Sequence, residues 1–257
     1  MKYLGSKNRI AKYIVPIIQK AVNENDIHYY IEPFVGGCNL IDKIKCDRKF
    51  GYDLDKYLIY LLIHVKEGGK LPDEMPKEIY DNLRIAWYNG NKDNKYPDWL
   101  IGCACYLASY NGRDFSAGYA KSGYENTPRG KRYRDYYQEA KTNLLKQAEQ
   151  PLFQDVMFGI SDYRRLEYLE EYVIYADPPY ENCKQYANSK DVFNHREFWD
   201  VMRKWSEKNI VFVSELSAPD DFQCIWQQEV SRSIKATDKS RAVEKLFIYK
   251  GGMYQCK

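Results

Sequence analysis

Four residues whose types could take part in a chemical reaction directly follow the strand-like run 171–176: Asp177, Pro178, Pro179 and Tyr180. The carboxylate of Asp177 can accept N–H hydrogens, and the carbonyl of Pro178 is a second acceptor whose direction the proline pair fixes. Two acceptors on the hydrogens of an aromatic amine localise the nitrogen lone pair, which is otherwise delocalised into the ring. The ring of Tyr180, rather than its hydroxyl, offers a stacking face for a base rotated out of its helix. These residues predict methylation of an exocyclic base amine without a covalent nucleophile. A plain proline turn after a strand is the alternative.

A second group of residues predicts a cofactor site. Gly36 and Gly37 follow a strand-like run within 30–40, and glycine lets a backbone approach a ligand closely. Asp53 ends the next such run, about 20 residues beyond the glycine pair, where α/β folds bind ribose hydroxyls. The alternatives are a tight turn for the glycines and a helix N-cap for Asp53 or Asp55. Together the features favour a cofactor that contains a nucleoside.

The sequence contains alternating strand-like and helix-like runs, which predict the elements that must position these groups. The predicted strands are 29–33, 48–52, 155–160, 171–176, 209–214, 223–230 and 243–249. The predicted helices are 56–66, 76–89, 97–110, 132–149 and 195–208, the last with Asn194 and Glu197 at capping-box spacing. This alternation predicts a mostly parallel sheet with helices on both faces, ending in an antiparallel hairpin.

Positive charge is concentrated in the segment 112–134. It has six Lys or Arg and two acids, whereas the rest of the chain has 33 Lys or Arg and 34 Asp or Glu. Aromatic residues and glycines are interleaved, as in a mobile loop or hairpin that contacts nucleic-acid phosphates. A second small basic loop, 231–241, precedes the last strand. A solvated loop with incidental charge is the alternative for 112–134.

Five segments in this order resemble the Dam-like, alpha-group DNA adenine-N6 methyltransferases that use S-adenosylmethionine. They are KYLGSK (2–7), EPFVGG (32–37), the acid at 53, ISDYRRL (160–166) and DPPY (177–180). Cys38 departs from the small residue that is common beside the glycine motif. The resemblance implies cofactor contacts from Tyr3, Lys7, Glu32, Phe34, Gly36, Gly37, Asp53, Asp162 and Asp177, and catalysis by Asp177, Pro178, Pro179 and Tyr180.

The resemblance also implies an α/β fold with a Rossmann-like methyltransferase sheet of seven mostly parallel strands and an antiparallel edge strand. We expect a catalytic domain over 1–57 and 149–257, and a helical target-recognition domain over 58–148. GYENTPRG (123–130) is similar to the recognition hairpin of enzymes that read GATC, although the upstream NGRDFSAGYA departs from it. We expect base contacts from Arg113, Asn126 and Arg129, and phosphate contacts from Lys131, Arg132 and Arg134.

Composition narrows the remaining possibilities. The seven cysteines form no C-x-x-C pair and there are three histidines, so we expect reduced thiols and no metal. No apolar run is long enough to cross a bilayer. We expect a cytoplasmic protein of a bacterium or a phage-infected host, with duplex DNA as partner, no membrane and no evident protein partner. The alternatives are a cytosine-N4 methyltransferase, a methyltransferase for RNA adenine or a protein amide, and a catalytically idle DNA-binding protein of this fold. The Asp at 177 favours a DNA base.

Overall fold

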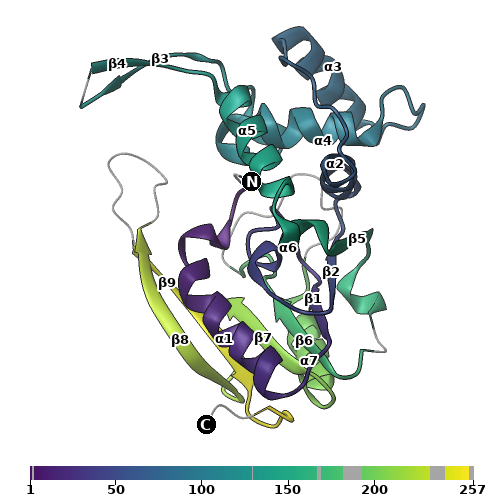
Figure 1. The fold of residues 1–257 in the computed structure, drawn as a ribbon, viewed down its shortest axis with the longest axis vertical. Helices are drawn as coiled ribbons and strands as arrows, with labels where there is room; N and C mark the ends of the chain where they lie inside the picture. The colour runs from purple at the N-terminus through teal and green to yellow at the C-terminus, as the bar shows by residue number, and fades with distance from the viewer. Residues whose placement is uncertain (2, 129, 167–168, 182–192, 232–240, 255–257) are drawn as a thin grey trace.

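The computed structural model describes the chain except for residues 2, 129, 167–168, 182–192, 232–240 and 255–257. At its centre is a seven-stranded sheet in the order β5-β2-β1-β6-β7-β9-β8 (Figure 1). The strands are β1 (Tyr29–Glu32), β2 (Arg48–Asp53), β5 (Val156–Ile160), β6 (Tyr172–Ala176), β7 (Ile210–Glu215), β8 (Phe222–Ser231) and β9 (Arg241–Tyr249). All seven predicted strands are therefore confirmed.

The sheet is mostly parallel, as predicted for a Rossmann-like methyltransferase. The pairs between β5, β2, β1, β6 and β7 are all parallel, and β9 is antiparallel to both β7 and β8. The antiparallel strand β9 is second from the edge rather than at the edge, because the chain first forms β8 at the edge and then returns to place β9 between β7 and β8. β6 and β7 read YVIYA and IVFVSE and are almost wholly buried, as expected for parallel strands covered on both faces.

Helices cover both faces of the sheet. The α-helices are α1 (Ala11–Glu24), α2 (Lys56–Lys66), α3 (Lys77–Tyr88), α4 (Asp98–Leu107), α5 (Tyr136–Ala148), α6 (Pro151–Gln154) and α7 (His195–Ser206). One apolar core joins α1 to the sheet and continues into α2 and α4, and a second core packs α7 against the other face. No helix among the described residues is long and apolar enough to cross a membrane.

The predicted helices agree with the structure apart from their ends. α2 matches 56–66, and the side chain of Asn194 caps α7 by accepting the Glu197 amide hydrogen at 3.1 Å. α1 was not predicted, and it forms with Pro16 inside it because Ile14, Ile18 and other apolar residues face the core. The helix predicted at 132–149 begins only at Tyr136, since the residues before it pair as a strand.

That strand belongs to a two-stranded hairpin of β3 (Gly123–Thr127) and β4 (Gly130–Arg134). In Figure 1 the hairpin extends away from the helices α3, α4 and α5. The segment before the hairpin is not a free loop, contrary to our prediction of a mobile segment. Phe115 is 1 % exposed, with its ring centroid 5.0 Å from that of Tyr80 and 5.5 Å from that of Trp87. Residue 115 is thus anchored among the helices, whereas the hairpin that follows extends from them.

Candidate active site

The DPPY segment begins where β6 ends, at the carboxyl edge of the parallel strands. The Nζ of Lys7 lies 2.8 Å from Oδ1 of Asp177, although the two residues come from opposite parts of the chain. Lys7 belongs to a short 3-10 helix, Lys7–Arg9, and its side chain is 7 % exposed. The ammonium also donates to the carbonyl of Gly5 at 3.2 Å. Lys7, predicted to contact cofactor, thus forms an ion pair with Asp177, the carboxylate predicted to act in catalysis.

The ionisation of Asp177 is set by two opposed effects. Burial raises the pKa of its carboxyl to about 6, while the charge and hydrogen bond of Lys7 act to lower it and the nearby Glu244 acts to raise it. For Lys7, burial lowers the pKa, but Asp177 and other acidic groups outweigh burial and leave that pKa raised. The pair is therefore ionised at neutral pH, and Asp177 is an acceptor under those conditions.

Tyr180 is held at both its face and its hydroxyl. The Nζ of Lys7 lies 4.7 Å from the ring centroid, within the range of a cation–π contact. The phenol hydroxyl donates to Oε2 of Glu244 on β9, and its oxygen lies 3.3 Å from Oγ of Ser214 on β7. Sequence reasoning selected neither Glu244 nor Ser214. The signal in β9 would have been an acid just before the apolar end of the strand, LFIY.

Glu215 fixes the residue that follows the tetrapeptide. Its Oε1 accepts the backbone N–H of Glu181 at 3.0 Å, and its Oε2 accepts the N–H of Leu216 at 2.6 Å. Burial raises the pKa of Glu215 to about 7 although these two amides favour the ionised form. This acid was also missed in the sequence, because nothing local distinguishes it from the last polar residue of a strand.

The glycine turn lies at the end of β1, next to β2 and β6. Gly36 has φ +48°, and a Cβ there would be 2.9 Å from Cε1 of Tyr3. A Cβ at Gly37 would be 2.7 Å from Cβ of Tyr3 and 2.6 Å from Nδ2 of Asn39. Only glycine fits at either position. The side chain of Tyr3 therefore packs directly against the backbone of the glycine turn.

Asp53 connects the glycine turn to the end of β2. Its Oδ2 accepts the N–H of Gly36 at 3.1 Å and its Oδ1 accepts the N–H of Asp55 at 3.0 Å. Burial raises the pKa of Asp53 to about 6. The N-cap of α2 is Asp55, which accepts from Tyr57 and Leu58, so the capping alternative for Asp53 is wrong. Two glycines without side chains and a carboxylate at neighbouring strand ends fit a ribose-bearing cofactor.

Glu32 and Phe34, also predicted to contact cofactor, differ in burial. Glu32 is 2 % exposed and accepts the hydroxyl of Tyr30 at 2.8 Å, and burial raises its pKa well above the usual range. The ring of Phe34 packs 5.3 Å from Tyr163 and 5.9 Å from Phe198 by centroid distance. Glu32 is therefore buried, whereas Phe34 is partly exposed, as Gly36 and Asp53 are.

Asp162 follows β5 and is already engaged by a cation. Its carboxylate accepts the N–H of Arg164 at 2.9 Å and two side-chain nitrogens of the same arginine. Hydrogen bonding to Arg164 lowers the pKa of Asp162 although burial acts in the opposite direction. A cofactor base that used this acid would have to share it with Arg164.

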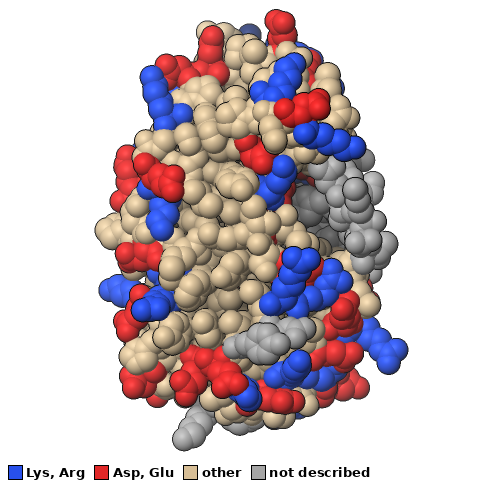
Figure 2. All heavy atoms as spheres, turned by 90° about the vertical axis from the view of Figure 1, so that its right-hand side faces the viewer, with Lys and Arg blue, Asp and Glu red and all other residues tan. Residues whose placement is uncertain are grey.

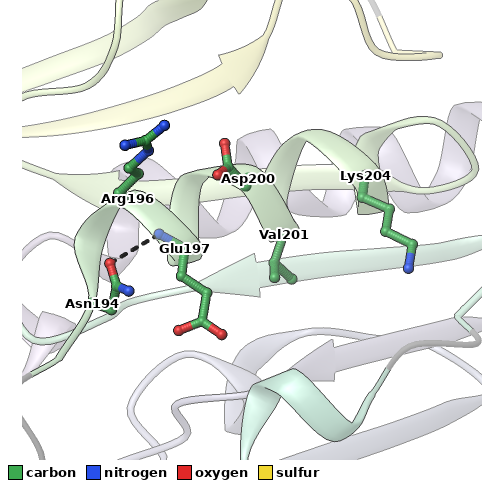
Figure 3. Close-up of a pocket in the computed structure, with 6 residues that line it drawn as sticks. All are labelled: Asn194, Arg196, Glu197, Asp200, Val201 and Lys204. Carbon is green, nitrogen blue, oxygen red and sulfur yellow. Dashed lines mark hydrogen bonds between the residues drawn. The ribbon is translucent and has the colours of Figure 1, made fainter.

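A shallow groove of about 410 Å³ runs beside α7 and does not coincide with these residues. Figure 3 shows side chains along this helix, with the Asn194 cap at its start. The lining residues are Asn194, Arg196, Glu197, Asp200, Val201 and Lys204. Its charges are mixed, and it includes none of the residues selected from the sequence. The groove therefore carries no candidate site.

The hairpin has two chemically different faces, because side chains alternate along a strand. Tyr124 pairs with Tyr133 and Asn126 with Lys131, and all four side chains are exposed. Tyr124 and Tyr133 are 76 % and 55 % exposed. This exposed hairpin face, defined by those four residues, combines amide, ammonium and aromatic groups.

The opposite face of the hairpin is tied to α5. Arg134 donates to Glu139 at 2.8 Å and to Glu125 at 3.4 Å, and its guanidinium lies 4.4 Å from the ring centroid of Tyr136. Arg132 also contacts Glu139, at 3.3 Å. Arg134, expected to contact a phosphate, is thus paired with acids on β3 and α5. The sequence did not indicate this because Glu139 lies on the next element.

The other predicted DNA contacts divide between exposed and undescribed residues. Arg113 is exposed after the short helix Tyr110–Gly112. Arg129 and most of the second basic loop, 232–240, lie outside the described residues. Figure 2 shows the side of the molecule near β5, where acids and bases are interspersed around an uncharged central area. That side presents no field of a single sign.

Comparisons with known proteins identify relatives of this arrangement. A family described as D12 class N6 adenine-specific DNA methyltransferase matches residues 3–208. The type II methyltransferase M.MjaIII of Methanocaldococcus jannaschii is 26 % identical over 210 residues, 70 % of this chain and 68 % of that protein. The solved structure of SMU.472, a putative methyltransferase complexed with SAH, aligns with 8 % identity and a TM-score of 0.28. That alignment covers 89 % of this chain but about half of the other, 48 %, and carries no argument here.

Proposed function

The chain belongs to the D12 class N6 adenine-specific DNA methyltransferase family, and from this premise we propose that it methylates N6 of an adenine flipped out of duplex DNA, with GATC as its site. The observation that carries the proposal is the Lys7–Asp177 ion pair beside Tyr180, at the strand edge that also holds the glycine turn. These groups supply an acceptor, a fixed ring and a cofactor turn within one region.

Asp177 and Pro178 perform the chemical activation in this proposal. The ionised Asp177 accepts one hydrogen of the adenine amine and the carbonyl of Pro178 accepts the other, so that the lone pair becomes available. Lys7 keeps Asp177 ionised at neutral pH despite its burial. Glu215 holds the backbone after Tyr180 and thereby limits how the segment can shift.

The methyl donor is S-adenosylmethionine, which supplies a methyl group bound to a positively charged sulfur. Asp53 and the glycine turn would hold its ribose-bearing part, and Tyr3 would bound the turn from above. Asp177 follows β6, which pairs with β1, the strand before the glycine turn, and this supports a role for Asp177 and its partner Lys7 toward both cofactor and base. Glu32, Phe34 and Asp162 act by supporting this site.

Residues 58–148 would recognise the DNA through the hairpin. We assign base contact to Asn126 and Arg113, because amide and guanidinium groups read adenine and guanine edges and both side chains are exposed. Lys131, on the same exposed hairpin face as Asn126, would contact phosphate. Arg132 and Arg134 would instead hold the hairpin against α5.

The test is transfer of radiolabel from S-adenosylmethionine to duplex DNA, followed by nucleoside analysis and methylation sequencing. Labelled N6-methyladenine at GATC is the expected product, and label in N4-methylcytosine would refute the choice of base. Asp177→Ala should lower the rate at least a hundredfold, the size of a lost electrostatic contact of about 2.7 kcal/mol, while DNA binding persists. A variant that retains more than a few per cent of the rate would remove Asp177 from the mechanism.

A further inference from the structure

Glu244 lies on β9, beyond residue 208, where the match to the family ends. Its carboxylate accepts the hydroxyl hydrogen of Tyr180, and the Glu244 side chain is 14 % exposed. We propose that Glu244 is a positioning residue that fixes the ring of Tyr180 for the target base. The inference rests on the proposed function, because it takes Tyr180 as the ring against which the base stacks.

Glu244 interacts more closely with Tyr180, through a hydrogen bond, than with the charge of Lys7. Oε2 of Glu244 is 3.9 Å from Nζ of Lys7, which is too long for a hydrogen bond. Lys7 has a nearer anion, Asp177, at 2.8 Å. Ser214 is 3.3 Å from the same phenol oxygen and is the weaker partner of the two. The main role of Glu244 is therefore to accept from Tyr180.

This hydrogen bond constrains the ring in a way that Lys7 alone cannot. Holding the para oxygen from β9 fixes the direction of the ring axis, while the ammonium over the ring face limits rotation about that axis. A ring fixed in both respects loses little conformational freedom when a base stacks on it.

The arrangement changes what we expected of Tyr180 from the sequence, where only the ring was needed. Tyr180→Phe keeps the ring but leaves a largely buried carboxylate without its donor. The substitution should therefore slow methylation. It should act through the same interaction as a change at Glu244, so that the two effects are not independent.

The experiment compares Glu244→Ala, Glu244→Gln, Tyr180→Phe and the double variant Tyr180→Phe/Glu244→Ala. Single-turnover methylation and the fluorescence of 2-aminopurine at the target adenine report chemistry and base placement. Glu244→Ala should lower the methylation rate by about tenfold or more, as for a lost charge-assisted hydrogen bond. Glu244→Gln should lose less, because its amide oxygen still accepts from Tyr180. The double variant should be no slower than Tyr180→Phe.

Matched controls separate positioning from general damage. Glu149→Ala and Glu149→Gln make the same changes at an exposed acid after α5 and should leave both readouts unchanged.

Equal losses for Glu244→Ala and Glu244→Gln would show that charge matters instead, and additive losses in the double variant would show independent roles. Either result overturns the inference. If Glu244→Ala fails to fold, the cycle is run with Glu244→Gln and Tyr180→Phe, and additivity there refutes it equally. A wild-type enzyme that neither methylates adenine nor brightens 2-aminopurine would refute the proposed function itself.

Discussion

Replacing Lys7 by Met should move the acid limb of the methylation rate to higher pH. Asp177 must be ionised to accept amine hydrogens, so activity is present above its pKa of about 6 and is lost as pH falls through that value. Lys7 lowers this pKa, and Glu244, which remains in the variant, raises it. Removing the cation therefore raises the pKa of Asp177 and leaves less of the active form at neutral pH.

The size of the shift follows from the geometry of the pair. A hydrogen bond between charged groups, here 2.8 Å from Nζ to Oδ1, contributes about 1.5–3 kcal/mol. At about 1.36 kcal/mol for each pKa unit, that corresponds to a rise of about one to two units. The acid limb should then lie at about pH 7–8 in place of about pH 6.

The assay is the single-turnover rate, with enzyme and S-adenosylmethionine in excess over DNA, measured on both sides of neutrality. Excess cofactor keeps the site occupied even if the variant binds cofactor more weakly. A single turnover ensures that product release does not contribute to the measured rate. Lys7→Arg keeps the charge and should keep the limb near its original pH. Lys56→Met removes an ion pair of similar length, 2.9 Å to Asp98, and should also leave it in place. A limb that stays near pH 6 in Lys7→Met would show that Lys7 does not control Asp177.

Further substitutions test the cofactor turn, the hairpin and the packing. Asp53→Ala should weaken S-adenosylmethionine binding by about 1.5–3 kcal/mol in calorimetry, and unchanged binding would restrict Asp53 to holding the turn. Asn126→Ala should relax discrimination at one base position in methylation sequencing, whereas retention of the full motif would place base contact elsewhere. Lys131→Ala should weaken binding to all sequences and reduce the salt dependence by about one unit, and a sequence-selective loss would contradict a phosphate contact. Phe115→Ala should cost about 3–5 kcal/mol of unfolding free energy in denaturant titration, because its buried ring packs against α3; a loss below about 1 kcal/mol would mean that the segment is not anchored there.

The sequence by itself determined where the strands lie and which strand ends carry the predicted site residues. A strand buried on both faces must be an uninterrupted apolar run, so 171–176 and 209–214 are visible as β6 and β7 without any partner. The end of such a run, at Asp177 or before a glycine pair, can likewise be recognised from neighbouring residues alone. The start of a helix can also be predicted from the local sequence when a capping residue such as Asn194 marks it.

Tertiary structure alone decided which of these groups touch. The pairing of Lys7 with Asp177, and of Tyr180 with Glu244, depends on the strand order, which places β9 between β7 and β8. It also paired Arg134, a predicted phosphate contact, with Glu139 on α5. Such contacts join side chains far apart in the chain or on successive elements, and no local pattern encodes the distance between them. The sequence shows which residues are chemically able to act, and the packing of the sheet and helices determines their partners.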